Sequence, residues 1–181
     1  MTPGAHRVLD AASRLFYERG IHAVGVDLIA AEAGVTKKTL YDRFGSKEQI
    51  VVEYLAARDE RWREYLARRL EGVTGTVPRV CAVFDASRDW MTEHGAKGCS
   101  MVNAHAEISD PAHPAYAVIS AQKRWMLALF TDLVGEPDTA RALMLLHEGA
   151  LVAHGLRIFP DAITRAREEA AGLLAGRVTS G

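Results

Sequence analysis

Cationic and polar side chains gather near residue 40 of the sequence. Lys37 and Lys38 are adjacent, and Lys47 follows in the same stretch. Ammonium groups bind phosphate oxygens, and hydroxyl groups can form hydrogen bonds with base edges. On a short exposed helix this combination suits the major groove of double-stranded DNA. The candidate DNA-binding residues of this stretch are Thr36, Lys37, Lys38, Thr39, Tyr41, Arg43 and Lys47.

Two short helical segments, over residues 27–33 and 37–44, would position these side chains. Gly34 lies between them and can adopt the left-handed conformation that a sharp turn requires. Thr36 is a good N-cap for the second segment. The arrangement is that of a helix-turn-helix. A pair of helices that only pack together is the alternative, since isolated patterns of this kind give false positives.

A wider set of positions resembles the DNA-binding domain of the tetracycline-repressor (TetR) family of transcriptional regulators. The matching positions are residues 20–35, Thr39, Leu40, Tyr41, Phe44, Ser46 and Lys47. The resemblance implies a helix-turn-helix domain over residues 1–47. It also implies that residues 48–181 form an effector-binding and dimerisation domain.

One departure from the family pattern adds a candidate residue. Many members carry Thr-Ser at the positions of Val24 and Gly25, where a hydroxyl group can cap the helix and contact a phosphate. The backbone amide of Val26 or the ring of His22 would take over that contact here. His22 therefore joins the candidate DNA-binding residues. Within the same domain, Tyr41 can alternatively be a partly buried spacer, and Arg43 a charge that is only solvated.

The net charge of the whole chain hides a difference between its parts. The 181 residues hold 22 Lys and Arg against 23 Asp and Glu, a formal charge of −1. Residues 1–47 alone hold seven Lys and Arg against five Asp and Glu. Phosphates respond to local charge within a Debye length of about 8–10 Å. The small excess of cations in the first part agrees with a nucleic-acid partner.

The chain as a whole reads as all-α, with about nine helices and no sheet. Apolar residues recur at three- and four-residue spacing, and no run alternates with period two for long. The expected helices cover residues 5–19, 27–33, 37–44, 46–70, 77–94, 102–107, 114–133, 138–158 and 161–174. No apolar stretch is long enough to cross a membrane, and no signal core follows Met1, so we expect a cytoplasmic protein without a membrane partner.

The second domain contains aromatic, methionine and histidine side chains that could line a pocket for a small-molecule effector. These candidates are Trp90, Met101, His105, Trp125, Met126, Met144 and His147. Each of them can equally be an ordinary core residue. The histidines lack the spacing of a zinc site, so no metal and no cofactor are expected. Cys99 can be a redox switch or a small buried thiol.

Residues 142–156 are apolar around most of the helix circumference, so this helix needs a partner beyond its own core. The family resemblance implies a homodimer through the last two helices. A twofold dimer would read a palindromic operator. The sequence thus favours a repressor that a small-molecule inducer releases from DNA.

Two other functions remain open at this point. An all-α enzyme or small-molecule carrier is one, although no catalytic motif is present and no enzymatic activity is expected. An architectural DNA-binding protein without an effector is the other. A turnover assay and a ligand screen distinguish them from the leading hypothesis.

Overall fold

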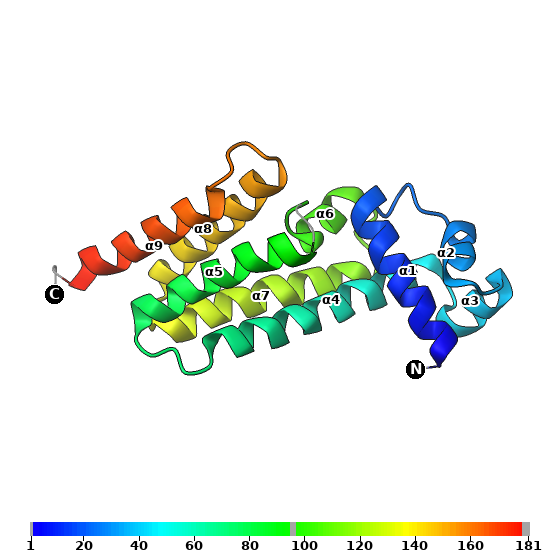
Figure 1. The fold of residues 1–181 in the computed structure, drawn as a ribbon, viewed down its shortest axis with the longest axis horizontal. Helices are drawn as coiled ribbons and strands as arrows, with labels where there is room; N and C mark the ends of the chain where they lie inside the picture. The colour runs from blue at the N-terminus through cyan, green and yellow to red at the C-terminus, as the bar shows by residue number, and fades with distance from the viewer. Residues whose placement is uncertain (1, 95–96, 179–181) are drawn as a thin grey trace. The chain divides into compact units, whose positions relative to one another are not determined.

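The structure, a computed structural model, describes residues 2–94 and 97–178, and this part of the chain is all-α. Its helices are shown in Figure 1. They are α1 (Pro3–Arg19), α2 (Val26–Ala33), α3 (Lys37–Phe44), α4 (Lys47–Leu70), α5 (Thr76–His94), α6 (Ser100–Glu107), α7 (Ala115–Val134), α8 (Pro137–Gly155) and α9 (Ala162–Val178). The expected fold class and the expected nine helices are confirmed for the described residues, which include no strand. No helix in these ranges is both long and apolar enough to cross a membrane.

The chain divides into two compact units whose boundaries fall inside α4 and α7. The first unit comprises Met1–Glu60 and Ser100–Gln122, and the second comprises Arg61–Cys99 and Lys123–Gly181. These units group residues by packing, so α6 belongs to the first of them. The functional boundary expected after Lys47 is a different kind of division and stays a prediction.

The first unit has its core where α1 packs against α2 and α3. Leu15, Ile29 and Leu40, one from each of these helices, are fully buried. Phe16 contacts Tyr54 of α4 at 5.7 Å between ring centroids. Apolar residues at helical spacing thus fix one face of each short helix, and the opposite face of α3 remains in solvent.

In the second unit, α9 packs against both α5 and α8, as Figure 1 shows. The core of this unit is apolar and contains Phe84, Phe130 and Leu143, all without exposed surface. A close backbone approach joins α8 to the segment before α6. A Cβ atom on Gly155 would lie 2.9 Å from the backbone nitrogen of Gly98, so a side chain at residue 155 would collide with main chain.

Candidate nucleic-acid interface and small-molecule pocket

The turn between α2 and α3 depends on a residue without a Cβ atom. Gly34 has φ 61° and ψ 40°, which is the left-handed conformation. Its N–H donates to the carbonyl of Ala31 at 3.2 Å, and Val35 N–H donates to Ala30 at 3.0 Å. These bonds satisfy the last carbonyl groups of α2 while the chain reverses. The turn predicted from the sequence is confirmed.

The first turn of α3 is fixed by a side-chain cap. The Thr36 hydroxyl oxygen accepts a hydrogen bond from the backbone N–H of Thr39 at 3.1 Å. It also lies 2.9 Å from the Thr39 hydroxyl. Leu40 and Phe44 are buried and hold the other side of the helix against the core. The cap and these two anchors set which residues of α3 face the solvent.

Both lysines of α3 are exposed and each already has an acidic partner. Lys37 Nζ lies 2.9 Å from a carboxylate oxygen of Asp27, and Lys38 Nζ lies 2.8 Å from Asp42. The hydrogen bond and the charge of Asp27 raise the pKa of Lys37, and Asp42 has the same effect on Lys38. Both side chains are therefore cations at neutral pH. A phosphate would compete with these carboxylates for them.

Tyr41 and Arg43 complete the exposed surface of α3. Tyr41 is 40% exposed, so its side chain is accessible in part, and a partly buried spacer stays an alternative to a DNA contact. The Arg43 guanidinium lies 5.0 Å from the centroid of the Phe44 ring and 3.5 Å from a carboxylate oxygen of Glu53. Six of the candidate DNA-binding residues thus share one helix and its N-cap: Thr36, Lys37, Lys38, Thr39, Tyr41 and Arg43.

Lys47 and His22 lie in a separate place within the first unit. Both line a hollow of about 190 Å³, together with acidic and histidine side chains that include Glu107 and His113. The backbone N–H of His22 donates to Glu107 Oε2 at 2.8 Å. This contact could not be predicted from the sequence, because the two residues are far apart in the chain and no local pattern connects them.

The candidate effector residues are divided between the two units. Met101 and His105 belong to α6 in the first unit, where Met101 is buried and the His105 ring packs on Tyr116 at 5.5 Å. The other candidates belong to the second unit. Trp90, Met126 and His147 are core residues there, and Met144 is partly buried against the same core.

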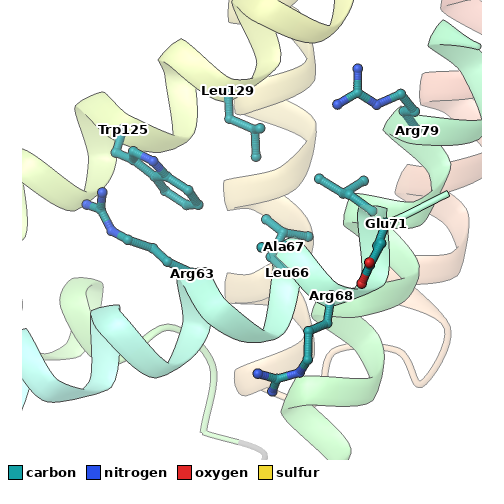
Figure 2. Close-up of a pocket in the computed structure, with 9 residues that line it drawn as sticks. Arg63, Leu66, Ala67, Arg68, Glu71, Arg79, Trp125 and Leu129 are labelled. Carbon is teal, nitrogen blue, oxygen red and sulfur yellow. The ribbon is translucent and has the colours of Figure 1, made fainter. Parts of the chain in front are cut away.

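Trp125 lines a pocket of the second unit. Figure 2 shows this pocket, which has a volume of about 550 Å³. The pocket lies between the second half of α4, the start of α5 and α7. Its lining residues are Arg63, Leu66, Ala67, Arg68, Leu70, Glu71, Arg79, Trp125 and Leu129. Four of the five α4 members (Arg63, Leu66, Ala67 and Leu70) recur at three- and four-residue spacing, a pattern that is present in the sequence but does not identify the facing helices.

A chain of polar side chains crosses the core of the second unit. His147 Nε2 lies 2.8 Å from Ser87 Oγ, which itself donates to the carbonyl of Val83. His147 therefore donates from Nε2 to the serine oxygen. Its Nδ1 atom lies 3.5 Å from Glu148 Oε1, which is long for a hydrogen bond. His147 thus has a close hydrogen-bond partner at Nε2 and a more distant polar neighbour at Nδ1.

Glu148 connects the polar side chains of Ser87 and His147 to Lys123 and Cys99. Lys123 Nζ donates to Glu148 Oε2 at 2.7 Å and to Cys99 Sγ at 3.2 Å. Burial by itself would raise the pKa of Glu148, but His147 and the Lys123 ammonium outweigh it and hold this pKa at about 2. The pair is therefore ionised inside the unit. Across the described residues, no group of three or more His, Cys, Asp and Glu is placed to hold a metal ion.

Similarity to known proteins agrees with the helix-turn-helix geometry. Residues 8–54 match the family model described as "Bacterial regulatory proteins, tetR family". The structure of SCO4454, a TetR-family transcriptional regulator from Streptomyces coelicolor, superposes with a TM-score of 0.84 and 32% sequence identity, covering 96% of this chain and 93% of that one. These similarities define a bacterial transcriptional regulator of the helix-turn-helix class. The chain belongs to the TetR family.

Two further relatives indicate how far the similarity extends. An uncharacterized HTH-type transcriptional regulator of Mycobacterium tuberculosis, MT1294, is 40% identical over 159 residues, covering 76% of this chain and 78% of the relative. The HTH-type transcriptional activator FasR of Mycolicibacterium smegmatis is 28% identical over 150 residues, covering 83% of this chain. The match spans 65% of the length of FasR.

Proposed function

We propose that the protein is a homodimeric DNA-binding transcriptional regulator whose affinity for a palindromic operator changes when a small molecule binds its C-terminal domain. The observation that carries this proposal is the capped, exposed α3 following the left-handed turn at Gly34. In this proposal residues 1–47 bind DNA, and residues 48–181 dimerise and bind the effector. The DNA-binding residues are Thr36, Lys37, Lys38, Thr39, Tyr41, Arg43, Lys47 and His22.

In the proposed complex, α3 enters the major groove with its exposed face toward the bases. Lys37 and Lys38 exchange their carboxylate partners for phosphate oxygens, and the released counterions favour binding at low salt. Thr39 and Tyr41 have hydroxyl groups that can reach base edges or phosphates. The lysines supply affinity, and the hydroxyl groups supply part of the sequence preference.

An exposed apolar stripe along α8 and its C-cap residue Leu156 supports the homodimer. Leu145, Val152 and Leu156 are 75%, 43% and 67% exposed, and their spacing puts them on one side of the helix. A Cβ atom on Gly149, within the same stripe, would meet no atom within 4 Å. Apolar side chains in contiguous exposed positions indicate an interaction surface. In a twofold dimer through the last two helices, this stripe would pack against its own copy.

We propose release from DNA as the response to the effector, so that the protein acts as a repressor. Coupling between the two sites requires that the effector bind the free and DNA-bound states with different affinity. The pocket around Trp125 supports an effector site in the second unit. A reporter gene behind the selected operator gives the direction of control, since the relative FasR is named an activator.

DNA binding is tested with an operator selected from random double-stranded sequences by the full chain. In the variant Lys37→Ala/Lys38→Ala, affinity should fall, and the slope of log K against log salt should decrease by roughly 0.9 for each lost phosphate contact. Arg124→Ala, which removes an exposed cation of α7, is the matched control and should leave both quantities unchanged. An unchanged salt slope in the lysine variant would show that α3 does not contact DNA.

The dimer is tested by sedimentation at several protein concentrations. Leu145→Lys/Leu156→Lys places two cations in the α8 stripe and should convert the dimer into a monomer, because burying unpaired charges opposes association. Ala128→Lys, at an exposed position of α7, should leave the dimer intact. A stripe variant that still sediments as a dimer would place the interface elsewhere.

A further inference from the structure

The pocket between α4, α5 and α7 has an apolar surface on which a hydrocarbon chain can lie. Leu66 is buried at its base, and Leu70, Trp125 and Leu129 pack against the core of the second unit. The volume of about 550 Å³ lies within the range of small-molecule sites. The apolar lining by itself does not distinguish between neutral and charged ligands.

The rim of the same pocket is cationic. Arg63, Arg68 and Arg79 line it against a single carboxylate, that of Glu71. In Figure 2, Arg63 lies beside Trp125 at one end, Arg79 lies at the opposite end, and Leu129 lies between them. The Arg63 guanidinium is 4.3 Å from the centroid of the Trp125 ring. Apolar surface is thus bordered by positive charge at both ends.

Two of the rim arginines differ from other arginines of the second unit. Arg69 is paired with Asp89, and Arg167 is paired with Asp85. Neither Arg68 nor Arg79 has an ion-pair partner among residues 2–94 and 97–178. Arg69, Arg88 and Arg167 of this unit are thus held by carboxylates, whereas Arg68 and Arg79 are available to an external anion.

We infer that this pocket binds a small amphipathic carboxylate, with the anionic head on Arg79 and the apolar tail along Leu66, Leu129 and Trp125. A planar guanidinium forms paired hydrogen bonds with a carboxylate and fits it better than it fits a neutral polar group. Arg79, at the end opposite Arg63, binds the head, and the stacked Arg63–Trp125 pair packs against the tail. This inference rests on the proposed effector role of the second unit.

The direct test is calorimetric titration of the full chain, without DNA, with octanoate, decanoate and dodecanoate below their micelle concentrations. At least one acid should bind saturably with a dissociation constant below about 1 mM. Decan-1-ol and decylamine have a similar tail without the negative charge and should bind at least about tenfold more weakly than decanoate. Equal affinity for the alcohol and the acid would overturn the inference, as would the absence of saturable binding by all three acids.

Variants assign the binding to this pocket. Arg79→Gln should weaken decanoate binding about tenfold, because it removes a charged hydrogen-bond donor. Arg88→Gln, which changes an arginine paired with Asp85 and Asp89 outside the pocket, should bind decanoate as the unmodified chain does. Trp125→Phe should weaken binding and remove the fluorescence change that decanoate produces. Unchanged affinity in both Arg79→Gln and Trp125→Phe would overturn the assignment.

The ligand experiment and the DNA experiment test separate hypotheses, so either hypothesis can be overturned without the other. Ligand binding is measured without DNA, so its absence would overturn the ligand class and leave the α3 assignment intact. Thermal unfolding of each variant establishes that it is folded before affinity is compared. Leu129→Gln provides a second variant of the apolar surface if Trp125→Phe unfolds, with the same expected loss.

Discussion

The ammonium group of Lys123 lies 2.7 Å from Glu148 Oε2 and 2.8 Å from Glu148 Oε1, so it contacts both carboxylate oxygens. Each of these side chains is only 23% exposed. Burial opposes the charge on both residues, but the contacts with Glu148 and Cys99 raise the pKa of Lys123 overall, and the pKa of Glu148 is lowered to about 2. The ion pair thus couples α7 to α8 through groups that are charged inside the second unit.

This pair predicts a loss of stability in acid. The pKa of Glu148 falls from 4.5 to about 2 on folding, so its contribution is fully present above pH 4.5 and disappears as the pH falls through about 2. The linked free energy is at most about 3 kcal/mol. The free energy of unfolding is measured in urea at fixed protein concentration. The difference in this free energy between the unmodified chain and Glu148→Gln should shrink as the pH falls from 4.5 to about 2.

Glu64→Gln is the control for that series, because Glu64 is exposed on α4. The difference in free energy of unfolding between this variant and the unmodified chain should stay constant over the same pH range. A Glu148→Gln difference that is equally flat would mean that the Lys123 contact does not stabilise the carboxylate. For Lys123 the pH dependence of stability has the opposite sign. Its contribution to the free energy of unfolding is lost as the pH rises through its raised pKa.

The contact between Gly98 and Gly155 predicts intolerance of any side chain. A Cβ atom on Gly155 would lie 3.0 Å from the Gly98 Cα atom, and main chain cannot rotate away. Gly155→Ser should lower the free energy of unfolding by about 1–3 kcal/mol. Gly25→Ser adds the same side chain where a Cβ atom meets nothing within 4 Å, and it should change stability by a few tenths of a kcal/mol. Equal midpoints in urea for both variants would refute the close approach.

The Thr36 cap predicts a difference between two small substitutions. Thr36→Ala removes the acceptor for the Thr39 N–H and should cost about 1 kcal/mol in urea unfolding. Thr36→Ser keeps a hydroxyl oxygen in the same place and should stay within a few tenths of a kcal/mol of the unmodified chain. If serine costs as much as alanine, the methyl group and not the cap stabilises α3.

The bond between Glu107 and the His22 amide can be followed by hydrogen exchange. The His22 N–H donates to Glu107 Oε2 at 2.8 Å, so Glu107→Ala should accelerate exchange of this amide. Glu107→Gln keeps an acceptor oxygen and should retain part of the protection. Exchange of the buried Leu40 amide serves as the internal reference, since α3 does not depend on this bond. Unchanged exchange at His22 in Glu107→Ala would show that the amide is protected by something else.

Local chemistry was sufficient to predict α3 and its surroundings. The Gly34 turn, the Thr36 cap and the inward positions of Leu40 and Phe44 all depend on residues within a few positions of one another. Such patterns can be recognised in a sequence because helix caps, turns and 3.6-residue periodicity are short-range properties. The same reasoning predicted the helical segments but not every terminal residue, since helix ends also respond to packing.

The pairing of Lys37 and Lys38 with carboxylates could be predicted only in part from the sequence. Lys38 and Asp42 are four residues apart on one helix, a spacing that favours contact. Lys37 pairs instead with Asp27 on α2, and this contact depends on how the two helices cross. The proposed exchange of carboxylate for phosphate could therefore be formulated only with the tertiary structure.

The residue types of the effector candidates could not show which of them line a pocket. Tryptophan, methionine and histidine suit both a pocket and a core, and the helix packing buries Trp90, Met126 and His147 while leaving Trp125 at the pocket. The sequence by itself determined an all-α chain with a helix-turn-helix near its start, because those features arise from neighbouring residues. Only the tertiary structure decided which arginines face a cavity and which cations meet carboxylates, because these contacts join positions whose separation in the chain leaves no local pattern.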